Sequence, residues 1–179
     1  MNKQSEGAFP VWNYLQSDAE LYGIDLSANY KLTDAISFTN KSSYTVGNDL
    51  ENDRPIINIP AFNTRNSLSY TNDNWNNFSA SLTSEWTAEQ TEFPNNNFET
   101  FIAETGENIL VDVSTPPSAF HLLHFYSEVT FKTSKFTNLN LALSVNNLLD
   151  TSYRAYLNRL RYFADDLGRN IMLQLQFNY

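Results

Sequence analysis

The last nine residues of the chain alternate between apolar and polar side chains. Apolar residues stand at every second position from Ile171 to Tyr179, with glutamine or asparagine between them from residue 174 onwards, and only Met172 departs from the pattern. Alternation with a period of two is typical of a β-strand that has one apolar and one polar face. We therefore predict a strand at this end of the sequence.

The same alternation recurs along most of the chain, and short and long connections separate the runs in turn. Short turns are predicted near residues 33, 74 and 135, and long loops near residues 54, 105 and 161. Outer-membrane β-barrels connect their strands in this way. Residues 9–16 are a candidate for one further strand. The six earlier predicted strands span residues 19–30, 36–46, 62–71, 78–88, 123–132 and 139–146.

The polar face of these strands indicates which medium covers the apolar one. Serine, threonine, asparagine, glutamate and lysine dominate it, and a packed soluble interior would not accommodate so many polar side chains. The sequence offers no second sheet or amphipathic helix to cover the apolar face, so lipid is its natural partner. We predict an all-β, antiparallel up-and-down transmembrane β-barrel segment. Aromatic residues near the strand ends fit an interfacial girdle: Tyr22, Tyr30, Tyr44, Tyr70, Trp86, Tyr153 and Tyr179.

Composition excludes several classes of function. The net charge is -9 and no basic stripe occurs, which argues against nucleic acid as a partner. Cysteine is absent, so a disulfide framework or thiolate metal site is excluded. No apolar run approaches the ~18 residues of a membrane-spanning helix. Residues 1–7 are polar and unlike a signal peptide, and we expect the chain to be part of a longer protein.

One segment near the C-terminus makes the chain recognisable. The sequence Asn147–Tyr153 resembles the Asn-Leu-Phe-Asp-x-x-Tyr motif of TonB-dependent outer-membrane receptors, and Gly168-Arg169 followed by residues 171–179 resembles the family's continuation. Upstream, residues 19–25 and Ile59-Pro60 resemble two further family segments. The resemblance assigns family-motif or assembly roles to Asn147, Leu148, Asp150, Tyr153, Gly168, Arg169, Phe177 and Tyr179.

The resemblance also implies what surrounds this chain. Receptors of this family have a barrel of about 22 strands around a separate plug. Residues 1–179 would be the C-terminal seven or eight strands, with the plug and the earlier strands absent. The expected location is the bacterial outer membrane, with a periplasmic C-terminus. The implied partners are outer-membrane lipid and lipopolysaccharide, the barrel assembly machinery, and TonB through the absent N-terminal region.

The implied function is import of a scarce nutrient, with a ferric siderophore or another iron complex as the expected ligand. We expect the chain to be inactive by itself. Two alternatives stay open at this point. One is a small complete eight-stranded outer-membrane barrel with an adhesion or structural role, which requires a barrel strand at residues 9–16. The other is a soluble carbohydrate-binding β-sandwich whose loop aromatics contact sugars.

No catalytic constellation is found, and we predict neither an enzyme nor a cofactor. His121 and His124 would lie on opposite faces of one strand, so no metal site is predicted. Glu85 and Glu128 face the predicted lumen, but their separation is undefined.

The loop from Arg154 to Arg169 is the best candidate for ligand binding. Arginine forks and aromatic rings suit anionic, partly aromatic ligands. Salt bridges with Asp165 and Asp166, or contact with lipopolysaccharide phosphates, are the alternatives for this loop. The residues proposed to contact a ligand are Arg154, Tyr156, Arg159, Arg161 and Tyr162.

Overall fold

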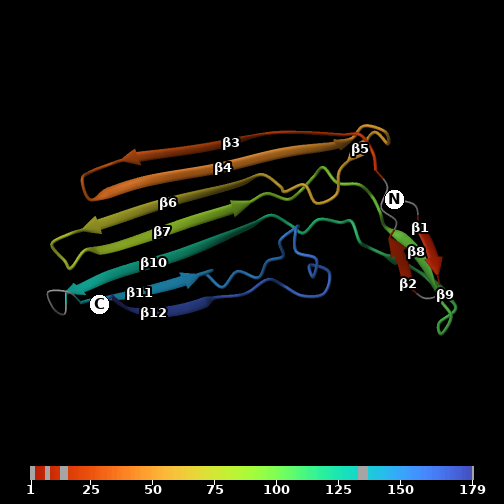
Figure 1. Cartoon of the computed structure of the whole chain (residues 1–179). Helices are drawn as coiled ribbons and strands as arrows, with labels where there is room; N and C mark the ends of the chain where they lie inside the picture. The colour runs from red at the N-terminus through yellow and green to blue at the C-terminus, as the bar shows by residue number, and fades with distance from the viewer. Residues whose placement is uncertain (1–2, 7–8, 13–15, 133–136, 179) are drawn as a thin grey trace.

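The computed structural model describes residues 3–6, 9–12, 16–132 and 137–178, and every regular element in them is a β-strand (Figure 1). No helix in the described residues is long and apolar enough to cross a membrane. The strands are β1 (Lys3–Glu6), β2 (Phe9–Trp12), β3 (Ala19–Lys31), β4 (Ile36–Asp49), β5 (Arg54–Pro55), β6 (Asn63–Asn72), β7 (Phe78–Thr87), β8 (Phe98–Ile102), β9 (Glu107–Val111), β10 (Phe120–Lys132), β11 (Asn138–Asn146) and β12 (Asn170–Asn178).

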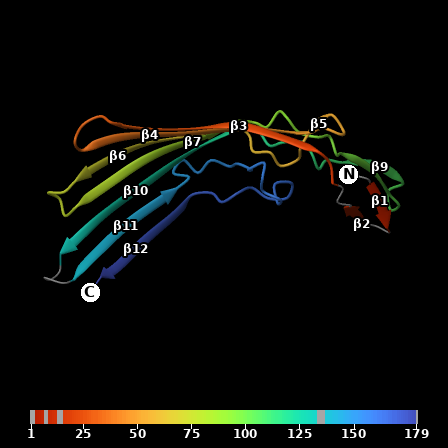
Figure 2. The same cartoon turned by 45° about the horizontal axis from the view of Figure 1, so that its top comes forward.

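One antiparallel sheet of eight strands contains most of the chain, in the order β12-β11-β10-β7-β6-β4-β3, with the short β5 paired to β4. Long strands that follow one another in sequence are neighbours in this sheet, which is the up-and-down arrangement. The predicted fold class is therefore confirmed. Figure 2 shows that the sheet is strongly curved, as a segment of a barrel wall would be.

Two short hairpins lie outside this sheet. β8 pairs with β9 inside the connection that was predicted as an irregular loop, and Gly106 takes a φ of 72° in its turn. Strands of five residues are too short to show a clear period, which is why the sequence did not reveal them. β2 pairs with β1, so residues 9–12 of the candidate strand at residues 9–16 do not belong to the main sheet. Residues 13–15 lie outside the described part of the chain, as does most of the predicted turn near residue 135.

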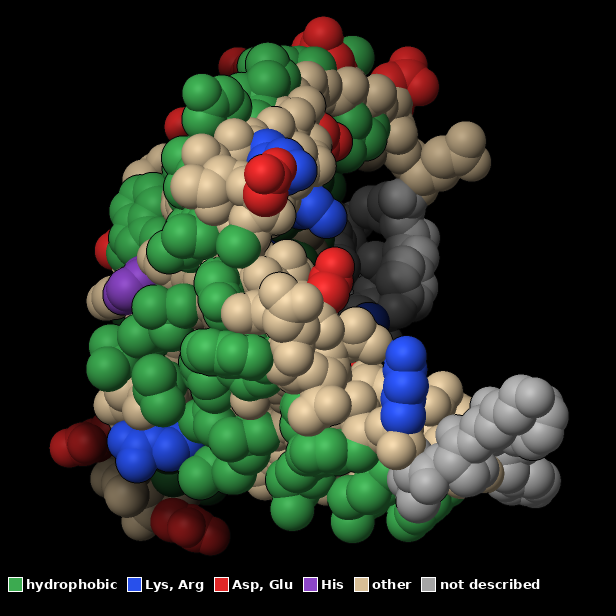
Figure 3. Space-filling model, turned by 90° about the vertical axis from the view of Figure 1, so that its left-hand side faces the viewer, with side chains coloured by type: hydrophobic (Ala, Val, Ile, Leu, Met, Phe, Trp, Pro, Cys, Tyr) green, Lys and Arg blue, Asp and Glu red, His purple; other side chains and the backbone are tan. Residues whose placement is uncertain are grey.

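The cross-strand register keeps the apolar positions of all long strands on one face. Leu68 is paired with Leu82, Leu82 with Phe125, Phe125 with Val145, and Val145 with Ile171. Figure 3 views the sheet from the side of its short turns and shows hydrophobic side chains gathered along its outer curve. Polar side chains occupy the inner curve. The outer face is therefore the one suited to lipid.

The long connections pack on one another at the opposite end of the sheet. The Gln90 side chain is buried and donates a hydrogen bond from Nε2 to the carbonyl oxygen of Ile59 at 2.7 Å. A Cβ atom on Gly47 would lie 2.7 Å from Cδ1 of Ile59, so a larger residue here would force the Ile59 side chain to move. These contacts hold the long loops over the strand ends, where the candidate site lies.

A charge on the outer face should destabilise the barrel, whereas the same charge on the inner face should not. We expect Leu82→Arg to lower the free energy of unfolding by about 2–4 kcal/mol, because Leu82 lies in the middle of the apolar band. The matched control is Ser81→Arg, on the neighbouring residue of the polar face. Urea titration of the receptor that contains this chain, folded in lipid vesicles, measures both. Equal losses would contradict the assignment of the faces.

Candidate functional site

The motif segment after β11 forms a tight turn that two residues with positive φ make possible. Asn147 has a φ of 51° and Asp150 a φ of 57°, a region that asparagine and aspartate enter more readily than most residues. The Asn147 side chain is 2% exposed. Its Nδ2 donates to the carbonyl oxygen of Thr151 at 2.8 Å, and its Oδ1 accepts from the Thr151 backbone N–H at 2.9 Å. One asparagine thus closes the turn.

The same turn is joined to the start of β12. Oδ1 of Asp150 accepts a hydrogen bond from the Arg169 backbone N–H at 2.8 Å, and Nε of Arg169 donates to the carbonyl oxygen of Leu148 at 2.9 Å. A Cβ atom on Gly168 would lie 2.9 Å from Oδ1 of Asp150. The structure therefore brings five of the family-motif residues, Asn147, Leu148, Asp150, Gly168 and Arg169, into one cluster, which we call the motif clasp.

The remaining motif residues lie elsewhere. The ring of Tyr153 packs against Phe120 with centroids 4.6 Å apart, and burial together with the nearby charge of Asp166 raises the pKa of Tyr153. Phe177 is 64% exposed on the outer face, where it is paired with Leu139. Tyr179 is outside the described residues.

The loop that follows the motif clasp is held together by its acidic residues. Nε of Arg154 lies 2.5 Å from Oδ1 of Asp165, and Nη1 of Arg154 donates to the carbonyl oxygen of Arg161 at 2.9 Å. Hydrogen bonds from Ser152 and then from Arg154 lower the pKa of Asp165. Asp166 accepts from the backbone N–H of Ala155 at 2.7 Å. The geometry at Arg154 therefore agrees with the alternative in which a loop arginine forms a salt bridge with Asp165.

Arg161 is the centre of this loop. It is buried, and its guanidinium carbon lies 4.4 Å from the ring centroid of Tyr156 and 4.7 Å from that of Tyr162. It also donates a hydrogen bond to the carbonyl oxygen of Tyr156. Burial raises the pKa of Tyr162, and the charge of Arg161 partly opposes the rise. These three side chains support the loop from inside.

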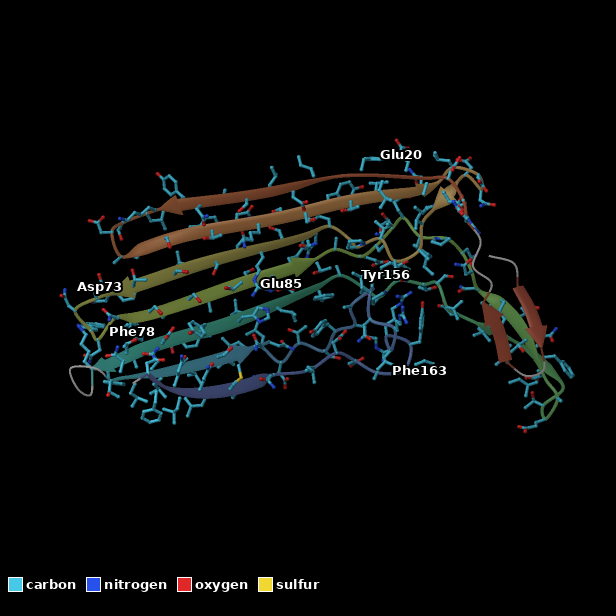
Figure 4. All side chains as sticks on the ribbon, viewed as in Figure 1. Glu20, Asp73, Phe78, Glu85, Tyr156 and Phe163 are labelled. Atoms are coloured by element: carbon cyan, nitrogen blue, oxygen red, sulfur yellow. The ribbon has the colours of Figure 1, made fainter. Side chains whose placement is uncertain are left out.

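The outward surface of the loop has a different composition. Arg159 is exposed, and its side chain makes no hydrogen bond or ion pair with any described residue. Around it in sequence stand four exposed apolar side chains, of which Phe163 is the most exposed at 83% (Figure 4). The prediction for this loop rested on its arginine and aromatic side chains, so its exposed leucines were not singled out, although apolar residues in an outer loop are a visible signal. The four apolar side chains are Leu157, Leu160, Phe163 and Leu167.

A charged cluster lies on the polar face of the sheet. Nη1 of Arg65 lies 3.2 Å from Oε2 of Glu85, and Nε2 of His124 lies 3.6 Å from the same oxygen. His121 faces the other side of β10, where Nε2 lies 2.7 Å from Oγ of Ser84. Among the described residues, no three histidine, aspartate or glutamate side chains form a group that could hold a metal ion.

We expect Asn147→Ala to lower the free energy of unfolding by about 2–3 kcal/mol, because two part-buried backbone groups of Thr151 lose their partners. The matched control is Asn170→Ala, at an exposed position at the start of β12, which should change stability by less than about 0.5 kcal/mol. Chemical unfolding of the receptor that contains this chain provides the measurement. If the two variants lose equal stability, Asn147 does not support the turn as described.

Comparison with known proteins connects this geometry to a family. The family model described as "TonB dependent receptor-like, beta-barrel" matches residues 2–148. The matched region includes Asn147 and Leu148 and ends before Asp150, Gly168 and Arg169. The family roles of the motif residues stay predictions. A search of curated proteins gave no significant match.

The fold is similar to that of a solved structure titled "Copper transporter OprC", with a TM-score of 0.71 and 19% sequence identity. The match covers 91% of this chain and 24% of that chain, so this chain spans about a quarter of the length of that protein. At this identity the likeness concerns the fold alone. Since the family model matches well over half of the chain, and the curved antiparallel sheet agrees with it, the chain belongs to the β-barrel family of TonB-dependent receptor-like proteins.

Proposed function

We propose that this chain is the C-terminal part of the barrel of an outer-membrane TonB-dependent transporter. Receptors of this family are transporters and not enzymes, and the family match over residues 2–148 is the observation that carries the proposal. The short turns would face the periplasm together with the C-terminus, and the long loops the outside. The plug, the segment that contacts TonB and the other strands would be supplied by the rest of the receptor.

The two edges of the sheet support this arrangement. Within the described residues, β3 and β12 each have a single neighbour in the main sheet. Open edges are not tolerated in lipid, because their backbone N–H and C=O groups lack partners. Further barrel strands would pair with both, and the barrel assembly machinery would recognise the end of β12 with Phe177 and Tyr179. The chain alone would be inactive.

The composition of the outward surface of the loop between β11 and β12 supports the proposal that the ligand is anionic and partly apolar. Arg159 supplies an unpaired cation beside exposed leucine and phenylalanine side chains. Such a surface suits a large metal complex with an organic shell, such as a ferric siderophore, better than a bare ion, which needs converging metal ligands. A copper cargo is the second candidate, because the similar solved structure is titled a copper transporter.

The two alternative functions have less support. A complete eight-stranded barrel would need residues 9–16 in the main sheet, and β2 is paired with β1 instead. A soluble sandwich would need a second layer over the apolar face, and no described element lies there, since leucines of β6, β7 and β12 are exposed on this face.

The orientation can be tested by cysteine labelling, because this chain contains no cysteine of its own. In the receptor that contains the chain, we expect Arg159→Cys to react with a membrane-impermeant maleimide on intact cells. Asp73→Cys, in a short turn, should react only after the outer membrane is permeabilised. The reverse pattern would overturn the proposed location of the long loops.

The ligand proposal predicts a charge-dependent affinity. We expect Arg159→Glu to weaken binding of the ferric complex of an anionic tris-catechol siderophore by about tenfold or more, because a charge-assisted contact is replaced by repulsion. Lys31→Glu is the control, since Lys31 is also exposed but lies at the short-turn end, where it is ion-paired with Asp34. Isothermal titration calorimetry on the purified receptor measures both. Unchanged affinity in Arg159→Glu would exclude this residue as a ligand contact.

A further inference from the structure

The outer face of the sheet is largely apolar, and one polar patch on it spans four strands. The patch lies between the Leu68–Leu82 pair on one side and Tyr44 and Trp86 on the other. Six residues form this patch, which we call the outer polar patch. They are Asn40 and Ser42 of β4, Thr64 and Asn66 of β6, Ser84 of β7 and His121 of β10.

The strand register creates this patch from positions far apart in the sequence. Asn40 is paired with Asn66, and Ser42 with Thr64, across β4 and β6. Asn66 is in turn paired with Ser84 across β6 and β7. Directly paired residues share a face of the sheet, so these side chains point to the same side as the neighbouring leucines.

The polar groups of the patch are hydrogen-bonded to one another. Nδ2 of Asn40 donates to Oδ1 of Asn66 at 2.7 Å and lies 3.2 Å from Oγ1 of Thr64. The hydroxyls of Ser42 and Thr64 are 2.8 Å apart, and Oγ of Ser84 lies 2.7 Å from Nε2 of His121. These contacts form two hydrogen-bonded groups, one across β4 and β6 and one across β7 and β10.

The network leaves hydrogen-bonding groups free on the outer face. Nδ2 of Asn66 donates to no described residue, although its Oδ1 is engaged by Asn40. Nδ1 of His121 likewise has no partner among the described residues, and His121 is exposed. Unpartnered polar groups are costly in a hydrocarbon medium. Groups that accept hydrogen bonds at this place would remove that cost.

The depth of the patch indicates which part of a lipid it meets. Tyr44 and Trp86 lie at the long-loop end of the band, where aromatic rings sit at the headgroup level. Ser84 is two residues from Trp86, about 7 Å along the strand and about 5 Å in depth at a strand tilt of about 40°. Asn40 is four residues from Tyr44, about 10 Å in depth by the same reckoning. The patch therefore extends from about 5 Å to about 10 Å below the level of these aromatic rings.

We propose that the outer polar patch binds the acyl-chain linkage region of lipopolysaccharide, through its amide and ester carbonyls and its chain hydroxyls. The inference rests on the proposed function, because it requires the long loops to face the outer leaflet. Hydroxylated, amide-linked chains carry both acceptors and donors below the headgroup. Ordinary phospholipids carry only ester carbonyls, which lie at the level of the headgroup. These carbonyls do not reach the deeper Asn40–Asn66 pair.

The test is lipid retention by the full receptor. The wild-type receptor and the Asn66→Leu variant are purified in mild detergent and titrated separately with lipopolysaccharide and with phosphatidylethanolamine. Native mass spectrometry counts the bound lipid. We expect Asn66→Leu to weaken lipopolysaccharide binding by about tenfold, because the free amide donors are lost and Asn40 loses its partner. Phosphatidylethanolamine binding should be weak and unchanged.

The matched control is Ser127→Leu, because Ser127 is a polar residue of the same face between Ala80 and Leu143 but outside the patch. It should bind lipopolysaccharide as the wild type does. Heat-modifiable mobility in gel electrophoresis shows that each variant is folded. Equal binding by wild type and Asn66→Leu, or a preference for phosphatidylethanolamine, would overturn the proposal. Surface labelling of Arg159→Cys separates this result from a failure of the proposed function, since it reports the orientation independently.

Discussion

The structure depends on one constraint: the backbone hydrogen bonds of neighbouring strands must be made in a register that keeps the alternating apolar side chains of the long strands on the same face. Side chains in a strand alternate between the two faces, so a shift of one residue would move a whole strand's leucines to the wrong side. The row from Leu68 to Ile171 across five strands shows that no such shift occurs. The same register makes one face suited to lipid and the other to a polar lumen.

The motif clasp extends this constraint to the loop. By joining Asp150 to the backbone of Arg169, it returns the chain to the sheet at the position where β12 must begin its pairing with β11. The loop between them is then closed by internal contacts around Arg161. Its outward surface is free to differ from its interior, and the proposed ligand contact uses that surface.

The sequence predicted the sheet well because each long strand has enough residues to establish its period. It did not predict the β8–β9 hairpin, whose strands are short, or the pairing of β2 with β1, because pairing partners are not encoded by a local period. Three arginines of the loop, Arg154, Arg159 and Arg161, were predicted as ligand contacts. The structure separates them, since Arg154 and Arg161 are engaged inside the loop and Arg159 is exposed.

The outer polar patch allows the contribution of the sequence to be separated from that of the tertiary structure. By itself the sequence determined an all-β segment with one apolar and one polar face, because alternation is a local property of a strand. It also contained the interruption of the apolar face at Asn40 and Ser42. Only the tertiary structure decided that Thr64, Asn66 and Ser84 meet them there. Their contact depends on the register between strands, which is set by long-range backbone hydrogen bonds that no local pattern specifies.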